Sequence, residues 1–532
     1  MASRPSISIH WLGALLCGVA AVCSAPSLAL AQTWEYSPYN IRLWVAVEST
    51  TATLGLTELL QQEVAQGARR ASGVVWRIFP EAAPSALQVD LLTRLDAISI
   101  EQVRAAIPGV FQVNPQLFGR HYVAAAGDGE MLALDKIVVV AVREVDQGYS
   151  IGIRELDVAT QQWGDLFSSS TNQVEAVPGI ALRQVIRAIR PIAKVEKVEG
   201  RSIVARLRAG GLIVAADSPA IVDSGRVMTP VIRRNSAKRA ATPPSIYAPA
   251  WSYVSIEERK DTTILGTVHS GYGSVIPAKG GPRTERLLLG LTPQYSATRL
   301  ELRARVTASS SGKAPPPLGR LLTGYEVYVK NPGEEKTELL GLTDWQGGID
   351  LEPTDKPLRL FYIKNGGQML GRLPYVVGQQ PVITANVVDD DPRLAAESYI
   401  KSLQSRVLDL VARRQILQVR IRSKLKKGDY AGSKQLVTAF RSLPTAGQLT
   451  LELEDRQRRM SHVPGVTGKR IEKLFSDGHK LLQGFLDSAD ADKLAAEVVE
   501  AEKKGPPPAA PAEQETPTSE PTKTGDPVPP AA

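Results

Sequence analysis

Four histidines, His121, His269, His462 and His479, are the residues best suited to acid–base or metal chemistry after position 31. They lie far apart in the sequence, and none belongs to an H-E-x-x-H motif or another closely spaced ligand pair. Without cysteine, a zinc site would have to gather histidines and carboxylates from distant segments. We therefore expect each histidine to be a surface or structural residue, and we predict no metal site and no cofactor.

His269-Ser270, followed by Gly271 and Gly273, comes nearest to a hydrolase motif. It differs from the G-x-S-x-G nucleophile elbow, and its surroundings do not predict a strand, a sharp turn and a helix. A glycine-rich β-turn accounts for the same residues. We therefore predict no catalytic residue here, and the sequence contains no P-loop or G-x-G-x-x-G nucleotide motif.

The acidic triplet Asp389-Asp390-Asp391 is followed by Pro392. A proline in the first turn after an acidic N-cap is typical of a helix start, so capping explains at least one of the three carboxylates. Consecutive side chains also point in different directions, which suits a shared ion poorly. We expect the start of a helix, with ion binding as the alternative.

The strongest signal is a basic segment at 401–427, where nine Lys and Arg residues face a single acid, Asp409. One interpretation is a solvated helix face, paired in part with Glu452, Glu454 and Asp455. The other is an anion-binding surface. The candidate residues for that surface are Arg406, Arg413, Arg414, Arg420, Arg422, Lys424, Lys426 and Lys427.

Residues 1–31 are typical of a secretory signal peptide. Arg4 precedes a short apolar stretch from Trp11 to Val22, and Ala29-Leu30-Ala31 is a small-x-small cleavage site. Cleavage removes Arg4 from the 63 basic residues and none of the 55 acidic ones, which leaves a charge of +7. It also removes both cysteines, so neither a disulfide framework nor a thiolate metal site is expected. A lipid anchor on Cys23 is the alternative.

The rest of the 532-residue chain predicts a multi-domain α+β protein. In 32–193, strand-like and helix-like patterns alternate, with strands at 41–47, 74–79, 137–142 and 149–158 and helices at 57–70, 86–95, 100–106 and 177–189. Ile137 to Val142 is a continuous apolar run, which is typical of a central strand buried on both faces. We predict an α/β sandwich for this region.

Part of this domain resembles small α/β domains of bacterial envelope proteins. The residues that carry the likeness are Val139–Arg143 and the segment from Tyr149 to Thr160, which ends in an L-x-D-x-x-T pattern. They are similar to paired strands of the Tol–Pal propeller protein and of the curli-secretion lipoprotein. In those families a glycine follows, whereas this chain has Gln161 and Gln162. The resemblance implies a non-catalytic envelope domain.

Residues 194–308 contain short strand-like runs separated by Gly, Pro and Ser clusters, which predicts one or two small β-barrels. The last of these runs is 300–306. Residues 309–317, with the sequence SSSGKAPPP, are expected to form a linker.

Residues 318–388 predict a β-sandwich. The pattern Thr343-Asp344-x-x-Gly347-x-Ile349 resembles the prealbumin-like sandwich that follows the catalytic domain of some carboxypeptidases. In this pattern Asp344 is expected to cap its own turn, and Gly347 to supply a positive φ. Modules of this kind serve many secreted proteins as spacers or binders.

Residues 389–504 are expected to form helical hairpins. Apolar positions at 4-3 spacing from Leu403 to Lys424 predict a long amphipathic helix of the coiled-coil type. Residues 505–532 hold nine prolines in 28 positions with a net acidic charge, which predicts a disordered tail.

These features favour a non-catalytic exported protein, periplasmic or extracellular, that binds or scaffolds in the envelope and docks to anionic envelope components through 401–427. Its expected partners are envelope proteins or anionic surface polymers rather than nucleic acid, and we expect no membrane span after cleavage. One alternative is a carbohydrate- or peptide-binding protein that uses an aromatic patch around Trp251, Tyr253, Tyr272 or Trp345. The other is a hydrolase of unrecognised type, which would need a pocket with paired carboxylates of shifted pKa.

Overall fold

The computed structural model divides the chain into two compact units, Met1–Val388 and Asp389–Ala532. The second unit begins where the sequence predicts the helical region to start. The signal peptide, Cys23, the 309–317 linker and residues 506–532 of the predicted tail lie outside the described residues. The structure describes residues 34–48, 50–51, 53–107, 110–111, 122–124, 131–235, 244–271, 273, 275–281, 283–306, 318–460, 463, 465–485 and 489–505.

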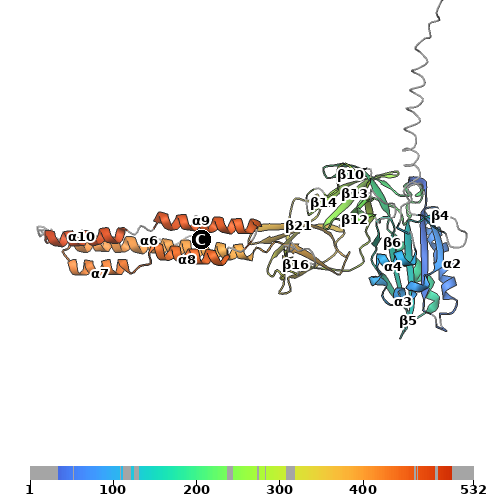
Figure 1. The fold of residues 1–532 in the computed structure, drawn as a ribbon, viewed down its shortest axis with the longest axis horizontal. Helices are drawn as coiled ribbons and strands as arrows, with labels where there is room; N and C mark the ends of the chain where they lie inside the picture. Colours follow the sequence, from blue (N-terminus) through green and yellow to red (C-terminus); the bar gives the residue numbers. More distant parts are fainter. Residues whose placement is uncertain are drawn as a thin grey trace, which may run out of the picture. The chain divides into compact units, whose positions relative to one another are not determined.

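The N-terminal domain is a mixed sheet with helices on both faces, as expected (Figure 1). Its strands run in the order β2-β1-β5-β6-β7, and β8 also pairs with β6. Strand β1 is parallel to both β2 and β5, whereas β5 and β6 form an antiparallel hairpin. The strands are β1 (Tyr39–Val47), β2 (Trp76–Ala82), β5 (Lys136–Val145), β6 (Gly148–Asp157), β7 (Gln162–Trp163) and β8 (Phe167–Thr171), and a separate hairpin pairs β3 (Tyr122–Ala124) with β4 (Met131–Ala133).

The apolar run in β5 is buried on both faces, which confirms the prediction from its sequence. Val138, Val140 and Val142 pack into the core beneath α2 (Leu56–Ser72) and α5 (Val177–Ala188). The alternate residues, such as Ile137 and Val139, pack into the core beneath α3 (Ser85–Thr93) and α4 (Ile100–Ala106). One strand therefore supplies both cores of the sandwich.

A buried cluster of charges closes one end of this sheet. Lys136 Nζ lies 2.5 Å from Glu155 Oε1 and 3.0 Å from Asp157 Oδ2, and all three side chains are buried. Burial opposes the charged forms, but the opposite charges nearby raise the pKa of Lys136 and lower that of Asp157. Asp157 Oδ1 also accepts hydrogen bonds from Thr160 N and Oγ1, at 2.8 and 2.7 Å. The L-x-D-x-x-T pattern is therefore a structural turn, and Gln161 follows it with φ of +49°.

The second domain is one closed barrel of six strands. The ring runs β11-β13-β14-β10-β9-β15 and closes through pairing of β15 with β11, while β12 extends the sheet beside β11. Its interior is filled by alternate residues of the strands, including Val195, Ala205, Val254 and Leu288. The strands are β9 (Ile192–Glu199), β10 (Ser202–Leu207), β11 (Val227–Arg234), β12 (Ser245–Tyr247), β13 (Ser252–Lys260), β14 (Thr263–Ser270) and β15 (Thr284–Gly290).

The third domain is a sandwich of two sheets with the orders β19-β16-β22 and β18-β17-β20-β21, packed around one apolar core. The predicted turn is present: Asp344 Oδ1 accepts hydrogen bonds from Gln346 N and Gly348 N, and Gly347 has φ of +66°. The strands are β16 (Thr298–Ala304), β17 (Glu326–Lys330), β18 (Glu338–Leu342), β19 (Gly348–Leu351), β20 (Leu358–Asn365), β21 (Gln368–Val376) and β22 (Val382–Val387).

One strand is in a different domain from the one that the sequence analysis assigned. We expected the run at 300–306 to belong to the barrel region, but β16 pairs in parallel with β22 and antiparallel with β19. Leu300 and Leu302 face the sandwich core. The sandwich therefore begins before residue 300, and 309–317 connects two parts of this domain rather than two domains.

In the described part of the second unit, four helices pack along the 36-residue helix α6 (Asp391–Lys426). The first half of α6 packs with α8 (Ala446–Met460) and α9 (Gly465–Phe485) around Leu403, Val407 and Phe475. The second half packs with α7 (Tyr430–Arg441) and α10 (Asp490–Lys504) around Ile421 and Phe440. The 4-3 pattern of apolar residues therefore predicted the packed face of α6 correctly.

Candidate functional site

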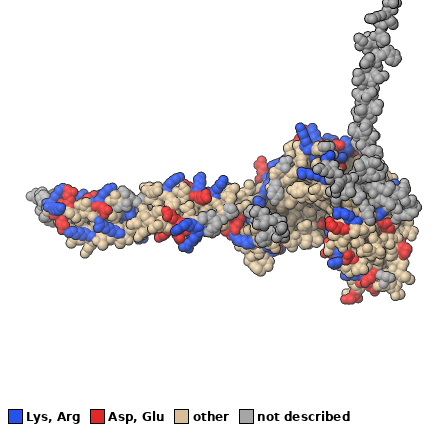
Figure 2. Space-filling model, in the orientation of Figure 1, with Lys and Arg blue, Asp and Glu red and all other residues tan. Residues whose placement is uncertain are grey.

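Four of the eight candidate basic residues on α6 form ion pairs with nearby acids. Arg406 pairs with Glu452 of α8 at 3.0 Å, which is one of the partners that the sequence indicated. Arg413 pairs with Asp409 at 2.9 Å, Arg422 pairs with Glu497 of α10 at 3.2 Å, and Lys424 pairs with Asp429. Exposed pairs of this kind stabilise the fold little, but they reduce the local positive charge. Figure 2 shows basic and acidic side chains interspersed over the helical unit.

Arg414 is a structural residue. Its side chain is buried at a core position of the 4-3 pattern, between the two apolar clusters of the unit. The guanidinium lies 5.5 Å from the centre of the Phe440 ring, and Nη2 donates to Pro444 O at 3.4 Å. Burial and these contacts place Arg414 inside the bundle, away from any surface that a ligand could reach.

The remaining three, Arg420, Lys426 and Lys427, are exposed and have no ion-pair partner among the described residues. Arg413, Arg420 and Lys427 follow one another at seven-residue spacing, so they lie along one side of the helix. Beside them is an exposed apolar stripe of Leu408, Ile416 and Val419, which are 68%, 52% and 69% exposed. These seven residues, Leu408, Arg413, Ile416, Val419, Arg420, Lys426 and Lys427, are called the α6 face below.

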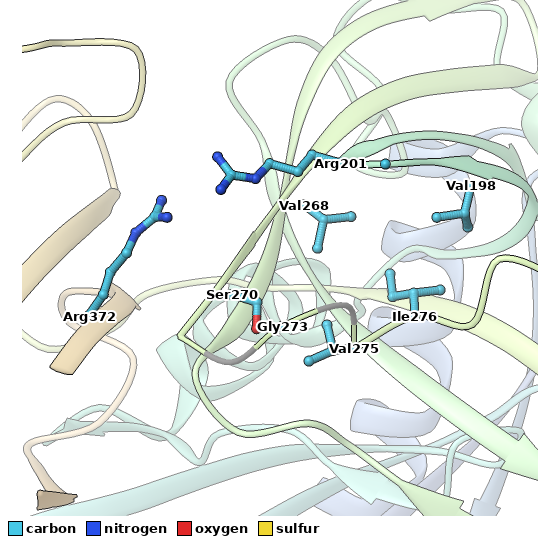
Figure 3. Close-up of a pocket in the computed structure, with 9 residues that line it drawn as sticks. Val198, Arg201, Val268, Ser270, Gly273, Val275, Ile276 and Arg372 are labelled. Carbon is cyan, nitrogen blue, oxygen red and sulfur yellow. The ribbon is translucent and has the colours of Figure 1, made fainter. Parts of the chain in front are cut away.

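A cavity of about 300 Å³ lies between the barrel and the sandwich of the first unit. Arg201, in the turn after β9, and Arg372, on β21, line it together with Ser270 at the end of β14. Figure 3 shows the two arginine side chains reaching into the same space from different domains. The other lining residues are Val198, Gly200, Val268, Gly273, Val275 and Ile276.

His269, next to this cavity, is held in its neutral form. Its Nε2 lies 2.9 Å from Ser255 Oγ, and burial, together with the positive charges of Arg372 and Arg201, lowers its pKa to about 4. A catalytic histidine of the serine-hydrolase type is oriented by a carboxylate. Among the described residues, no carboxylate accepts a hydrogen bond from the His269 ring. The arrangement gives His269 a structural role.

Two of the four aromatic residues proposed for ligand binding pack against the sandwich. Trp251 and Tyr253 lie against Tyr375 of the sandwich, with ring centroids 5.8 and 6.3 Å apart, and Tyr253 donates to Gln379. Trp345 is 79% exposed, and Tyr272 is outside the described residues. Trp251 and Tyr253 therefore help to join the barrel and the sandwich, and the described residues do not form the expected exposed patch.

A second cavity, of about 390 Å³, adjoins these aromatic side chains and contains one carboxyl group among its lining residues, that of Asp165. Burial raises the pKa of Asp165, although Arg190 and Arg154 oppose the shift. The hydrolase alternative needs two carboxylates, one as acid and one as base or nucleophile. The described lining of this cavity does not provide that pair.

The long helix begins at the acidic triplet, as expected, but the N-cap is Asp390 rather than Asp391, and its side chain makes no capping hydrogen bond. Asp390 is the N-cap residue, one position before the helix, and its carboxylate forms a buried ion pair with Arg393 at 2.7 Å. Asp389 Oδ1 accepts a hydrogen bond from Asp391 N. Across the described parts of the chain, no group of three or more His, Cys, Asp and Glu side chains is placed to hold a metal ion.

Several solved structures match the chain distantly. The crystal structure of TolB from Acinetobacter baumannii aligns with 66% of this chain and 96% of its own, at 11% identity and a TM-score of 0.16. At that TM-score the likeness carries no argument about fold or function. No family model matches the chain, and no curated protein does. Among the described helices, none is long and apolar enough to cross a membrane.

Proposed function

We propose that this chain is a non-catalytic exported protein of the bacterial envelope that binds or scaffolds other components, and that the α6 face docks it to an anionic envelope component. Support for export comes from the signal-peptide pattern at 1–31. The observation that carries the docking proposal is the group of exposed cations Arg420, Lys426 and Lys427, which have no acidic partner among the described residues.

The chemistry of the α6 face fits an anionic surface with some apolar character. Long-range attraction by several like charges concentrates anionic partners near the surface. The adjacent Leu408, Ile416 and Val419 then supply apolar area that water would otherwise cover. Both features lie on one continuous helix, with Lys427 as its C-cap residue, and the helix backbone holds them in a fixed relation to each other.

The test is a salt wash of envelopes from cells that produce the full chain. Exposed charges are screened at high salt, so we expect retention at low salt and release near half-molar salt. The triple variant Arg420→Gln/Lys426→Gln/Lys427→Gln should be released at clearly lower salt, because it removes the cations that have no acidic partner.

A matched control removes three exposed cations from another helix of the same unit. Lys469, Arg470 and Lys473 lie on α9, and no ion pair within the described residues engages them. The variant Lys469→Gln/Arg470→Gln/Lys473→Gln has the same net charge as the α6 variant and should keep the wild-type release profile. Equal behaviour of the two variants, or a freely soluble wild-type protein at low salt, would contradict docking through the α6 face.

A further inference from the structure

Two arginines from different domains converge on the cavity between the barrel and the sandwich (Figure 3). Within the described part of the chain, neither guanidinium has a hydrogen-bond or ion-pair partner, and Arg372 Nε is buried without one. Arg201 is exposed and Arg372 is half-buried, and two like charges that face the same space repel each other. An anion between them would remove that repulsion and satisfy the buried donor.

The rest of the lining shows what kind of anion fits. Four aliphatic side chains, Val198, Val268, Val275 and Ile276, line the barrel side of the cavity. A strongly hydrated anion such as phosphate would lose its water against this wall without replacement. A carboxylate on an apolar body would place its charge on the guanidiniums, which match carboxylates in geometry, and its carbon chain on the aliphatic wall.

We propose that this cavity is a binding site for a small organic carboxylate with an apolar body, in which Arg201 and Arg372 bind the carboxylate. A volume of about 300 Å³ is at the lower end of the range for small-molecule pockets, so the ligand is a small acid rather than a polymer. Because the two arginines come from the barrel and the sandwich, the bound acid would also connect these domains. The proposal is independent of docking by the α6 face, which belongs to the other unit.

The first test is calorimetric titration of the full chain with four probes: hexanoate, its neutral analogue hexanamide, acetate and inorganic phosphate. We expect hexanoate to bind, acetate to bind more weakly because it leaves the aliphatic wall uncovered, and hexanamide not to bind. Arg201→Gln and Arg372→Gln should each weaken hexanoate binding about tenfold or more, since each removes a charge-assisted hydrogen bond. Arg283→Gln, which removes an exposed arginine that does not line the cavity, should leave hexanoate binding unchanged.

The second readout is the pKa of His269, followed by the NMR signal of its imidazole ring and assigned with His269→Gln. Arg201, Arg372 and Glu257 are the charged groups that act on this histidine. A bound carboxylate offsets the two arginine charges, so hexanoate should raise the pKa of His269 from about 4. This shift should disappear in Arg201→Gln and Arg372→Gln, whose own folding is checked by circular dichroism.

Several results would overturn the proposal. They are the absence of hexanoate binding at millimolar concentration, equal binding of hexanoate and hexanamide, and hexanoate binding that neither arginine substitution weakens. Tighter binding of phosphate than of hexanoate would also overturn it, because the aliphatic wall would then have no part in recognition.

Discussion

Lys136 lies fully buried between Glu155 and Asp157, in the strand pair that also carries the envelope-domain resemblance. Removing one member of a buried ionic group leaves its partners charged and without compensation in a medium of low polarity. Substitutions in this cluster are therefore expected to destabilise the fold more than substitutions in an exposed pair.

The first prediction concerns this cluster. Lys136→Met should lower the free energy of unfolding of the N-terminal domain by about 3–5 kcal/mol, because Asp157 loses its ion pair with Lys136 and Glu155 keeps only its ion pair with Arg190. Urea unfolding followed by tryptophan fluorescence measures the change. Lys197→Met, which removes an exposed lysine of the barrel, should change the stability by less than about 1 kcal/mol. Similar values for both variants would show that the buried cluster contributes no more than a surface pair.

The second prediction follows from the neutral state of His269. Its pKa is about 4 in the folded protein and near 6.5 when unfolded, so the unfolded chain binds the proton more tightly between these values. The contribution of His269 to stability is therefore complete above pH 6.5 and is lost as the pH falls towards 4. His269→Gln should remove this part of the pH dependence, measured as thermal midpoints from pH 7 to 4. An unchanged slope in the variant would contradict the assignment.

At the scale of elements, local sequence pattern predicted most of the helices and strands, because the buried apolar residues of a helix or strand recur at the spacing typical of that element. The double burial of β5 and the packed face of α6 are examples. Pairing between distant segments left no such local signal. The run at 300–306 has the same alternation in a barrel or a sandwich, and its partners β19 and β22 lie some fifty to eighty residues away.

The candidate sites show the same contrast between local sequence pattern and contacts between distant segments. The basic residues of α6 were found because they are neighbours on one helix, but which of them are paired depends on Glu452 and Glu497 of other helices. Arg201 and Arg372 were missed because each is an ordinary turn or strand residue in the sequence. Only the packing of the barrel against the sandwich brings them to one cavity. The short strands β7 and β12 were also missed, since few apolar positions mark them.

The third prediction tests that packing. A Cβ atom on Gly271 would lie 2.5 Å from the carbonyl oxygen of Arg372, so the barrel can approach β21 this closely only without a side chain. Gly271→Ala should lower the free energy of unfolding of the first unit by about 1–3 kcal/mol, which is measured by thermal unfolding. Gly273→Ala is the control, because nothing lies within 4 Å of its added Cβ. If both variants have the same thermal midpoint as the wild type, the close approach of the barrel to β21 is not required for stability.

At the scale of the whole molecule, the chain consists of two units with separate apolar cores. The fourth prediction is that they fold independently. Fragments 34–388 and 389–505 should each unfold cooperatively, and their circular dichroism spectra should add up to that of the combined fragment 34–505. Thermal midpoints within a few degrees of the corresponding transitions in 34–505 are expected. A helical fragment that is unfolded on its own would show that the first unit supports it.

Helix α6 has a mechanical consequence. Its 36 residues span about 54 Å at ~1.5 Å per residue, and it carries one three-helix core along its first half and another along its second. Load applied along the helix would pass from one bundle to the other through this single rod, near Arg414. Helix α6 therefore couples the two three-helix bundles mechanically. A break in α6 between the bundles would uncouple them while leaving each bundle its own core.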